Sequence, residues 1–181
     1  MERAEAWALV QANVSNKNIV KHMLAVEAAM RAVARRLGED EESWALAGLL
    51  HDLDYEGTKD EPERHGLATV EMLEDAGLPT GVAEAILAHN KHKEAETPME
   101  KALLAVDPTT GLIVAAALMH PDKSLAACDV DFIVRRFGEK RFAAGADRDQ
   151  IATCSGLGLS LEEFLGLCLD GMRGAREELG L

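Results

Sequence analysis

The chain has 181 residues, of which 48% are hydrophobic and 28% charged, and this balance suits one globular domain with a sizeable core. Its net charge of −13 argues against a nucleic-acid polymer or an anionic membrane as the main partner, although a small anionic substrate is still compatible with it. Aromatic residues make up only 4% of the chain, so aliphatic side chains must fill the core, which favours packed helices over a β-sandwich.

The cysteines indicate a cellular compartment. Cys128, Cys154 and Cys168 form no CxxC motif, and three cysteines cannot all pair within one chain. We therefore expect reduced thiols in a cytoplasmic protein. The first residues do not have the pattern of a signal peptide. The longest apolar run, 111–119, is too short to cross a membrane, so no membrane partner is expected.

The first two predicted helices have clear start and stop signals. Residues 4–14 are helix-like, and residues 19–37 carry an apolar side chain at every third or fourth position. Ser15 or Asn16 can cap the second helix, and Gly38 follows it in the position that glycine prefers after a helix.

Three further helices are predicted before residue 90. Asp40 caps a helix that ends near His51, and the polar segment 52–63 is interpreted as a loop. Pro62 can lie in the first turn of one further helix, and Thr80 can cap another. These end near residues 76 and 89.

A capping box with proline at the first helical position marks the next helix, at Thr97-Pro98-Met99-Glu100. Pro108 lacks a backbone N–H and restricts the residue before it, so we expect this helix to break or kink at Asp107. Later helical segments are predicted at 111–119, 131–137, 147–153 and 161–179. No segment alternates as a strand does. The sequence therefore predicts a single all-α domain over residues 1–181.

The apolar run 47–50 ends in His51-Asp52. A buried imidazole or carboxylate is costly unless it is paired, hydrogen-bonded or bound to a metal. Adjacent helical residues project about 100° apart, so both side chains could reach one ion. The alternative is an ordinary helix end, with His51 in the last turn and Asp52 in the following loop.

Other residues of the same chemical types strengthen the first interpretation, although a lone histidine such as His22 is commonly a hydrogen-bonded core residue. Imidazole and carboxylate ligands without thiolate suit zinc, iron, manganese or nickel in an open catalytic site. Helical bundles build such sites from facing helices. The candidate ligands are His22, His51, Asp52, His65, His89 and Asp107.

The order of these residues resembles the HD-domain superfamily of metal-dependent phosphohydrolases. The resemblance covers roughly residues 19–119, and it is carried by His22, the pair His51-Asp52 after two leucines, and a distant Asp107. Further matches resemble small bacterial HDIG-type proteins: His65-Gly66, Ala85-Ile86 ahead of His89, and Thr110-Gly111-Leu112 after Asp107. One departure is Leu53-Asp54, where the family usually has Ile-Gly.

The resemblance implies a compact HD-domain bundle with its metal core at residues 19–119, on which helices in 124–179 pack. It implies one or two divalent transition-metal ions (Fe, Mn, Zn or Ni). The first ion would be held by His22, His51, Asp52 and Asp107. In two-metal members, residues at the positions of His65 and His89 hold a second ion, and Asp52 bridges.

The expected activity is hydrolysis of a small phosphate ester, either a nucleotide or a phosphorylated metabolite. Asp52 would orient the attacking water, and Asp54 or His92 would handle the proton of the leaving group. Two alternatives remain open: a di-iron oxygenase of the same family, and a non-catalytic protein that binds metal or nucleotide.

Other charged residues are weaker candidates. Arg64, Lys91 and Lys123 could contact phosphate or could be ordinary surface charges, and His120 is interpreted as structural. A basic cluster near the C-terminal third could guide an anion or balance nearby acids. Its members are Arg135, Arg136, Lys140, Arg141 and Arg148.

Overall fold

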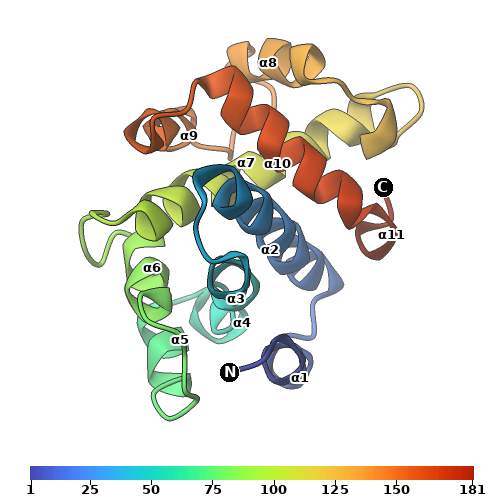
Figure 1. The fold of residues 1–181 in the computed structure, drawn as a ribbon. Coiled ribbons are helices and arrows are strands. Elements are labelled where there is room, and N and C mark those ends of the chain that lie inside the picture. Colours follow the sequence, from blue (N-terminus) through green and yellow to red (C-terminus); the bar gives the residue numbers. More distant parts are fainter.

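The computed structural model describes all 181 residues, and every regular element is helical, which confirms the predicted all-α fold (Figure 1). In chain order the elements are α1 (Arg3–Asn13), α2 (Lys17–Leu37), α3 (Glu41–Leu50), α4 (Tyr55–Thr58), α5 (Leu67–Met72), α6 (Val82–His89), α7 (Pro98–Met119), the 3₁₀ segment η1 (Leu125–Ala127), α8 (Val130–Gly138), α9 (Arg148–Ala152), the 3₁₀ segment η2 (Thr153–Leu157), α10 (Leu161–Gly174) and α11 (Arg176–Leu179).

Helix α2 lies at the centre of the bundle, where α3, α7 and α10 all pack against it (Figure 1). Glycines set two of these contacts. A Cβ added to Gly48 of α3 would lie 2.8 Å from the backbone nitrogen of Glu27. A Cβ on Gly171 of α10 would collide with the backbone of Ala28 on α2. Both helices therefore approach α2 backbone to backbone, which only glycine permits.

Most predicted start and stop signals are confirmed. Asn16 caps α2 and Asp40 caps α3, each through its side-chain oxygen. Thr97 and Glu100 form the predicted capping box of α7. Gly38 ends α2 with a left-handed φ of 75°. These signals act within one turn of helix, so the local sequence is sufficient to encode them.

Some predicted helices are shorter than expected. The helix expected from Pro62 begins only at Leu67, because turns occupy residues 62–66 and Gly66 has a φ of 82°. Gly81, not Thr80, is the N-cap of α6. The helix expected over 161–179 is interrupted at Ala175, the one over 147–153 becomes η2 from Thr153, and the loop 52–63 contains the short α4.

Of the break or kink predicted at Asp107, the break is wrong, because α7 continues through Pro108. Proline leaves the carbonyl four residues earlier, that of Leu104, without its helical donor. The side chain of Gln150 in α9 donates to this carbonyl from Nε2 over 2.8 Å. A tertiary contact thus replaces the missing helical bond.

With 22 residues, α7 is also longer than the apolar run 111–119 suggested, and it is apolar enough by length and composition to be a candidate membrane span. However, 56% of its most apolar window is buried inside the protein, as expected of a core helix.

One cluster of 41 buried hydrophobic residues extends from Ala6 to Leu179 and includes the three cysteines, which are free thiols. Segments before and after α7 therefore share one core.

Candidate metal centre

His51 and Asp52 lie where α3 ends in the interior of the protein. Residues 44–50 of this helix are all buried, and the imidazole of His51 is fully buried. The carbonyls of the last helical turn have no helical partner, and His51 Nδ1 donates to one of them, Gly48 O, over 2.8 Å. This bond fixes the ring so that Nε2 is the atom presented to the site.

His22 comes from α2 and Asp107 from α7. His22 Nε2 lies 3.1 Å from Asp107 Oδ1 and 3.2 Å from His51 Nε2. The Thr110 hydroxyl donates to the Asp107 carbonyl over 2.9 Å, so its oxygen accepts from His22 Nδ1 at 3.1 Å. Thr110 therefore orients the His22 ring in the same sense as the Gly48 carbonyl orients that of His51.

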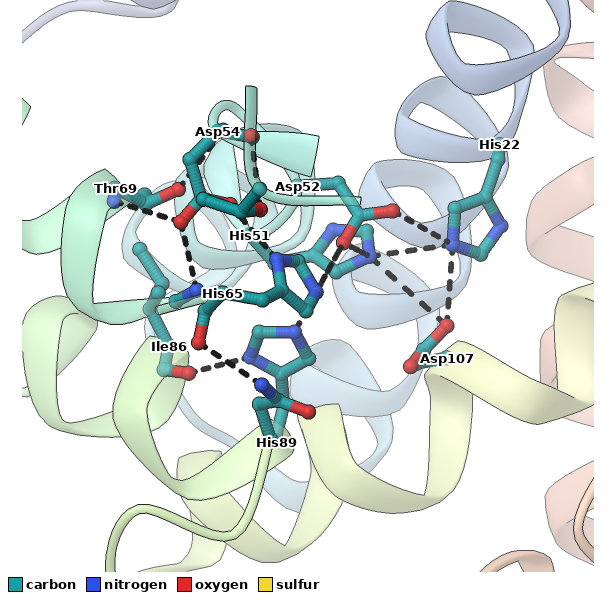
Figure 2. Close-up of polar contacts among 12 residues, drawn as sticks. His22, His51, Asp52, Asp54, His65, Thr69, Ile86, His89 and Asp107 are labelled. Carbon is teal, nitrogen blue, oxygen red and sulfur yellow. Dashed lines mark hydrogen bonds and ion pairs between the residues drawn. The ribbon is translucent and has the colours of Figure 1, made fainter. Parts of the chain in front are cut away.

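The remaining two histidines face the first pair across Asp52 (Figure 2). His89, at the end of α6, donates from Nδ1 to the Ile86 carbonyl. His65, in the turn before α5, donates from Nδ1 to Asp54 Oδ1 over 2.8 Å. All four rings thus use Nδ1 for an outer partner and direct Nε2 inward.

Asp52 lies at the centre of these Nε2 atoms. Its carboxylate oxygens are 3.2 Å from His65 Nε2, 3.4 Å from His51 Nε2, 3.6 Å from His22 Nε2 and 3.9 Å from His89 Nε2. The side chain is only 8% exposed. An aspartate surrounded by imidazoles in the interior is an arrangement typical of a metal centre.

One atom of the cluster has no partner within the protein: His89 Nε2 is buried and makes no hydrogen bond. A buried polar atom without a partner is unfavourable by roughly 1–3 kcal/mol. Two sets of ligand atoms lie within 4.8 Å of one another, namely His22, His51 and Asp107, and His51, Asp52 and His89. These residues fit a divalent metal, which would give His89 Nε2 the partner that the chain does not supply.

Electrostatics separates the protonation states of the two imidazoles nearest α5 and α6. Burial acts to lower the pKa of His65, but hydrogen bonds to Asp52 and Asp54 outweigh this effect and raise the pKa to about 10. Burial and the neighbouring His51 lower the pKa of His89 to about 4. His89 is therefore neutral at pH 7, with a lone pair on Nε2 as a metal ligand requires.

The carboxylates of the cluster remain ionised. Burial alone would raise the pKa of Asp52, but the surrounding imidazoles, His51 first, hold it well below its usual range. Burial also acts to raise the pKa of Asp107, and the hydrogen bond from His22 lowers it on balance. In turn, Asp107 raises the pKa of His22 despite burial.

Asp54, which could have been a solvated loop residue, is 5% exposed and lies behind His65. Its carboxylate accepts from His65 Nδ1 and from the backbone N–H groups of Gly66 and Thr69, at 2.7 and 3.1 Å. The Asp54 N–H in turn donates to the Thr69 hydroxyl. These bonds hold Asp54 away from the cluster and favour a positioning role over proton transfer.

His92 lies outside the cluster at an exposed position after α6, where Nε2 donates to the His65 carbonyl over 2.6 Å. Arg64 pairs with Glu71 on the surface, and Lys91 and Lys123 are exposed residues with positive φ. None of these three cations contacts the cluster.

Two members of the basic cluster of the C-terminal third have partners within the protein. Arg148 neither guides an anion nor balances an acid, because its guanidinium donates to backbone carbonyls of the segment 136–146. It thereby shapes a loop whose residues Ala143 and Gly145 line a cavity with His22 and Asp107. Arg136 stacks on Phe132 and Phe142.

The residues that orient the histidines were not predicted from the sequence. Thr110 lies three residues after Asp107 on one helix face, and this spacing was a usable signal. Thr69 and the Gly48 carbonyl carried no such signal, because their roles depend on how α5 and α3 meet the cluster.

Part of the chain matches a known family and a known protein. The family model described as the HD domain matches residues 19–118, more than half of the chain. Ribonuclease Y from Sulfurovum sp. (strain NBC37-1) is 32% identical over 91 residues, which cover 50% of this chain and 18% of that protein. The chain thus spans less than a fifth of the length of this curated relative. No solved structure matches the chain.

Proposed function

The chain belongs to the HD-domain superfamily of metal-dependent phosphohydrolases, and we therefore propose that it hydrolyses a small phosphate ester. The observation that carries the proposal is the inward convergence of four histidine Nε2 atoms on the ionised Asp52, with His89 Nε2 buried and unpartnered. A purely structural polar cluster would be expected to pair all of its buried atoms.

We propose that one ion would be held by His22, His51, Asp52 and Asp107, and a second by His65 and His89 with Asp52 as the shared ligand. To act as a ligand, His65 would release the proton that Asp52 and Asp54 stabilise in the ion-free chain. A divalent ion at such a site lowers the pKa of water and withdraws charge from a phosphoryl oxygen. Iron, manganese, zinc and nickel all suit these ligands.

The chain's own residues prepare the site for this reaction. Asp52, kept ionised by the surrounding imidazoles, can accept a hydrogen bond from the attacking water and so orient it. Asp54 holds the His65 ring in place. His92 is the proposed proton donor to the leaving group, because it is exposed and its hydrogen bond to the His65 carbonyl places it beside the cluster. Asp54 is less suitable, because its oxygens already accept three hydrogen bonds.

The proposed substrate is a nucleotide or another phosphorylated metabolite. The relative's name describes a ribonuclease, so a phosphodiester in RNA is the natural competitor. The net charge of −13 supports a small substrate over a polymer, since a polyanion would be repelled at long range. Together with the buried free cysteines, it also supports the proposal of a cytoplasmic protein without a membrane partner.

The test is elemental analysis of freshly purified protein, followed by a panel of phosphomonoesters, phosphodiesters and short RNAs with and without added manganese or iron. We expect bound metal and metal-dependent release of phosphate or cleavage of a diester, with His51→Ala as the inactive control. An oxygen-dependent product from an iron-loaded protein would instead favour the di-iron oxygenase. Bound metal without turnover of any substrate would favour the binding protein.

The number of ions is tested with His65→Ala and His89→Ala. If these residues hold a second ion, each variant should lose about one ion per chain and keep the other, and catalysis should fall far more than substrate binding. If wild type and both variants hold one ion under saturating manganese, the two histidines act around a single ion.

A further inference from the structure

A cavity of about 480 Å³ opens beside His22, between α2, the C-terminal half of α7 and α11. His22 and Thr110 line this cavity, and His22 is also one of the candidate metal ligands, so the cavity lies next to the proposed reaction site. Its volume lies within the range of small-molecule sites, which is about 300–1,000 Å³. The reaction proposed above does not use it.

Part of the cavity wall is apolar. Val114 and Leu118 come from α7, Leu179 from α11 and Ala25 from α2. Leu118 is 51% exposed and is therefore available for apolar contact with a ligand. In a chain with 32 acidic residues, none of the residues lining this cavity is an aspartate or a glutamate. The cavity therefore offers apolar contact, and no acidic side chain lines it.

Lys21 supplies a positive charge at the rim. A Cβ on Gly180 would lie 3.0 Å from Lys21 Nζ, so the ammonium group rests against the backbone after α11. The one lysine ion pair in the protein joins Lys93 and Glu100, and Lys21 Nζ thus has no carboxylate partner. An unpaired cation next to His22 is well placed to attract a negatively charged ligand.

We propose that this cavity binds the organic group of the substrate, and that this group is an aromatic ring or an alkyl chain. His22 marks the end at which the phosphate lies, the apolar wall contacts the organic group, and Lys21 attracts the anion. The inference rests on the proposed function for the phosphate ester and adds to it the chemical class of the organic group.

The test measures binding of two non-hydrolysable probes, phenylphosphonate and methylphosphonate, to the full chain by calorimetry, with and without manganese. The probes share the phosphonate and differ in the organic group. We expect phenylphosphonate to bind at least about tenfold more tightly, because its ring removes apolar surface from water. Equal affinities, or no measurable binding of either probe, would overturn the proposal.

Variants locate the effect. Leu118→Ser should reduce the preference for phenylphosphonate severalfold, and the partial exposure of Leu118 means that the change should not unfold the protein. Met119→Ser is the matched control, since Met119 is the next residue of α7, is 64% exposed and does not line the cavity. Lys21→Gln should weaken both probes by a similar factor. The same loss of preference in Met119→Ser as in Leu118→Ser would contradict the assignment.

This experiment separates the two proposals. If phenylphosphonate is preferred and the preference depends on Leu118, but no phosphate ester is hydrolysed, the proposed function is wrong and the cavity assignment stands. If phosphate esters are hydrolysed with no preference between phenyl and methyl groups, the proposed function stands and the cavity assignment is wrong.

Discussion

Helix α2 contributes to two buried regions of opposite character. Between Met23 and Val33 its apolar side chains pack against α3 and α10, and glycines bring the backbones together. Immediately before Met23, His22 enters a cluster of imidazoles and carboxylates (Figure 2). The apolar interface is complete as it stands, whereas the polar cluster leaves His89 Nε2 without a partner. The comparison indicates that the first region stabilises the fold and the second is organised to bind a ligand.

The largest effect is expected from a change in the apolar interface. Gly48→Ala places a Cβ 2.8 Å from a backbone atom of α2, which cannot move as a side chain could. We expect a loss of about 3 kcal/mol in the free energy of unfolding, measured by urea denaturation in the presence of a chelator. Gly138→Ala, where a Cβ would meet open space, is the control and should change stability by less than about 1 kcal/mol. Equal stability of the two variants would show that the α2–α3 contact can relax.

Metal removal should affect the polar cluster alone. With free metal at about 100 times the dissociation constant, binding stabilises the native state by about 2.7 kcal/mol, and a chelator should remove this amount. His51→Ala should abolish the effect of the chelator. Asp107→Asn, which keeps the size and removes the charge, should weaken metal binding while the fold survives. Wild-type metal content and melting temperature in both variants would mean that the metal binds elsewhere.

A smaller effect is expected from Asp54, which acts on the cluster through His65. Asp54→Asn removes the charge that orients this ring, and affinity for the ion held by His65 should fall about 10- to 100-fold, measured by chelator competition. Asp60→Asn changes an exposed aspartate in the neighbouring turn and should have no such effect. Equal affinities of the two variants would remove Asp54 from the site.

The smallest effect is expected at the helix that carries Asp107. Gln150→Leu removes the bond to the Leu104 carbonyl, and this should cost about 1 kcal/mol of stability without changing metal content. Gln11→Leu, at an exposed position of α1, is the matched control. A loss of metal in Gln150→Leu would show that this contact also sets the position of Asp107.

The sequence by itself determined the features that depend on neighbouring residues. The caps at Asn16, Asp40 and Thr97 and the stop at Gly38 act within one helical turn, so each could be predicted from a few letters. The candidate ligands could also be identified from the sequence, because their types and order resemble the HD-domain family. Helix starts near Pro62 and Thr80 were misplaced, since glycine conformations at residues 66 and 81 outweighed the capping preferences.

Only the tertiary structure decided how these residues act together. His22 is oriented by Thr110, which lies 88 residues away, and the carbonyl freed by Pro108 is satisfied by Gln150, which lies 46 residues from Leu104. Asp54 is held behind His65 by a hydrogen bond from the backbone N–H of Thr69 in α5. Arg148 donates to backbone carbonyls because the loop that contains Ala143 folds around its guanidinium. Each of these roles depends on a hydrogen-bond partner brought close by packing, and local periodicity and capping signals contain no information about such partners.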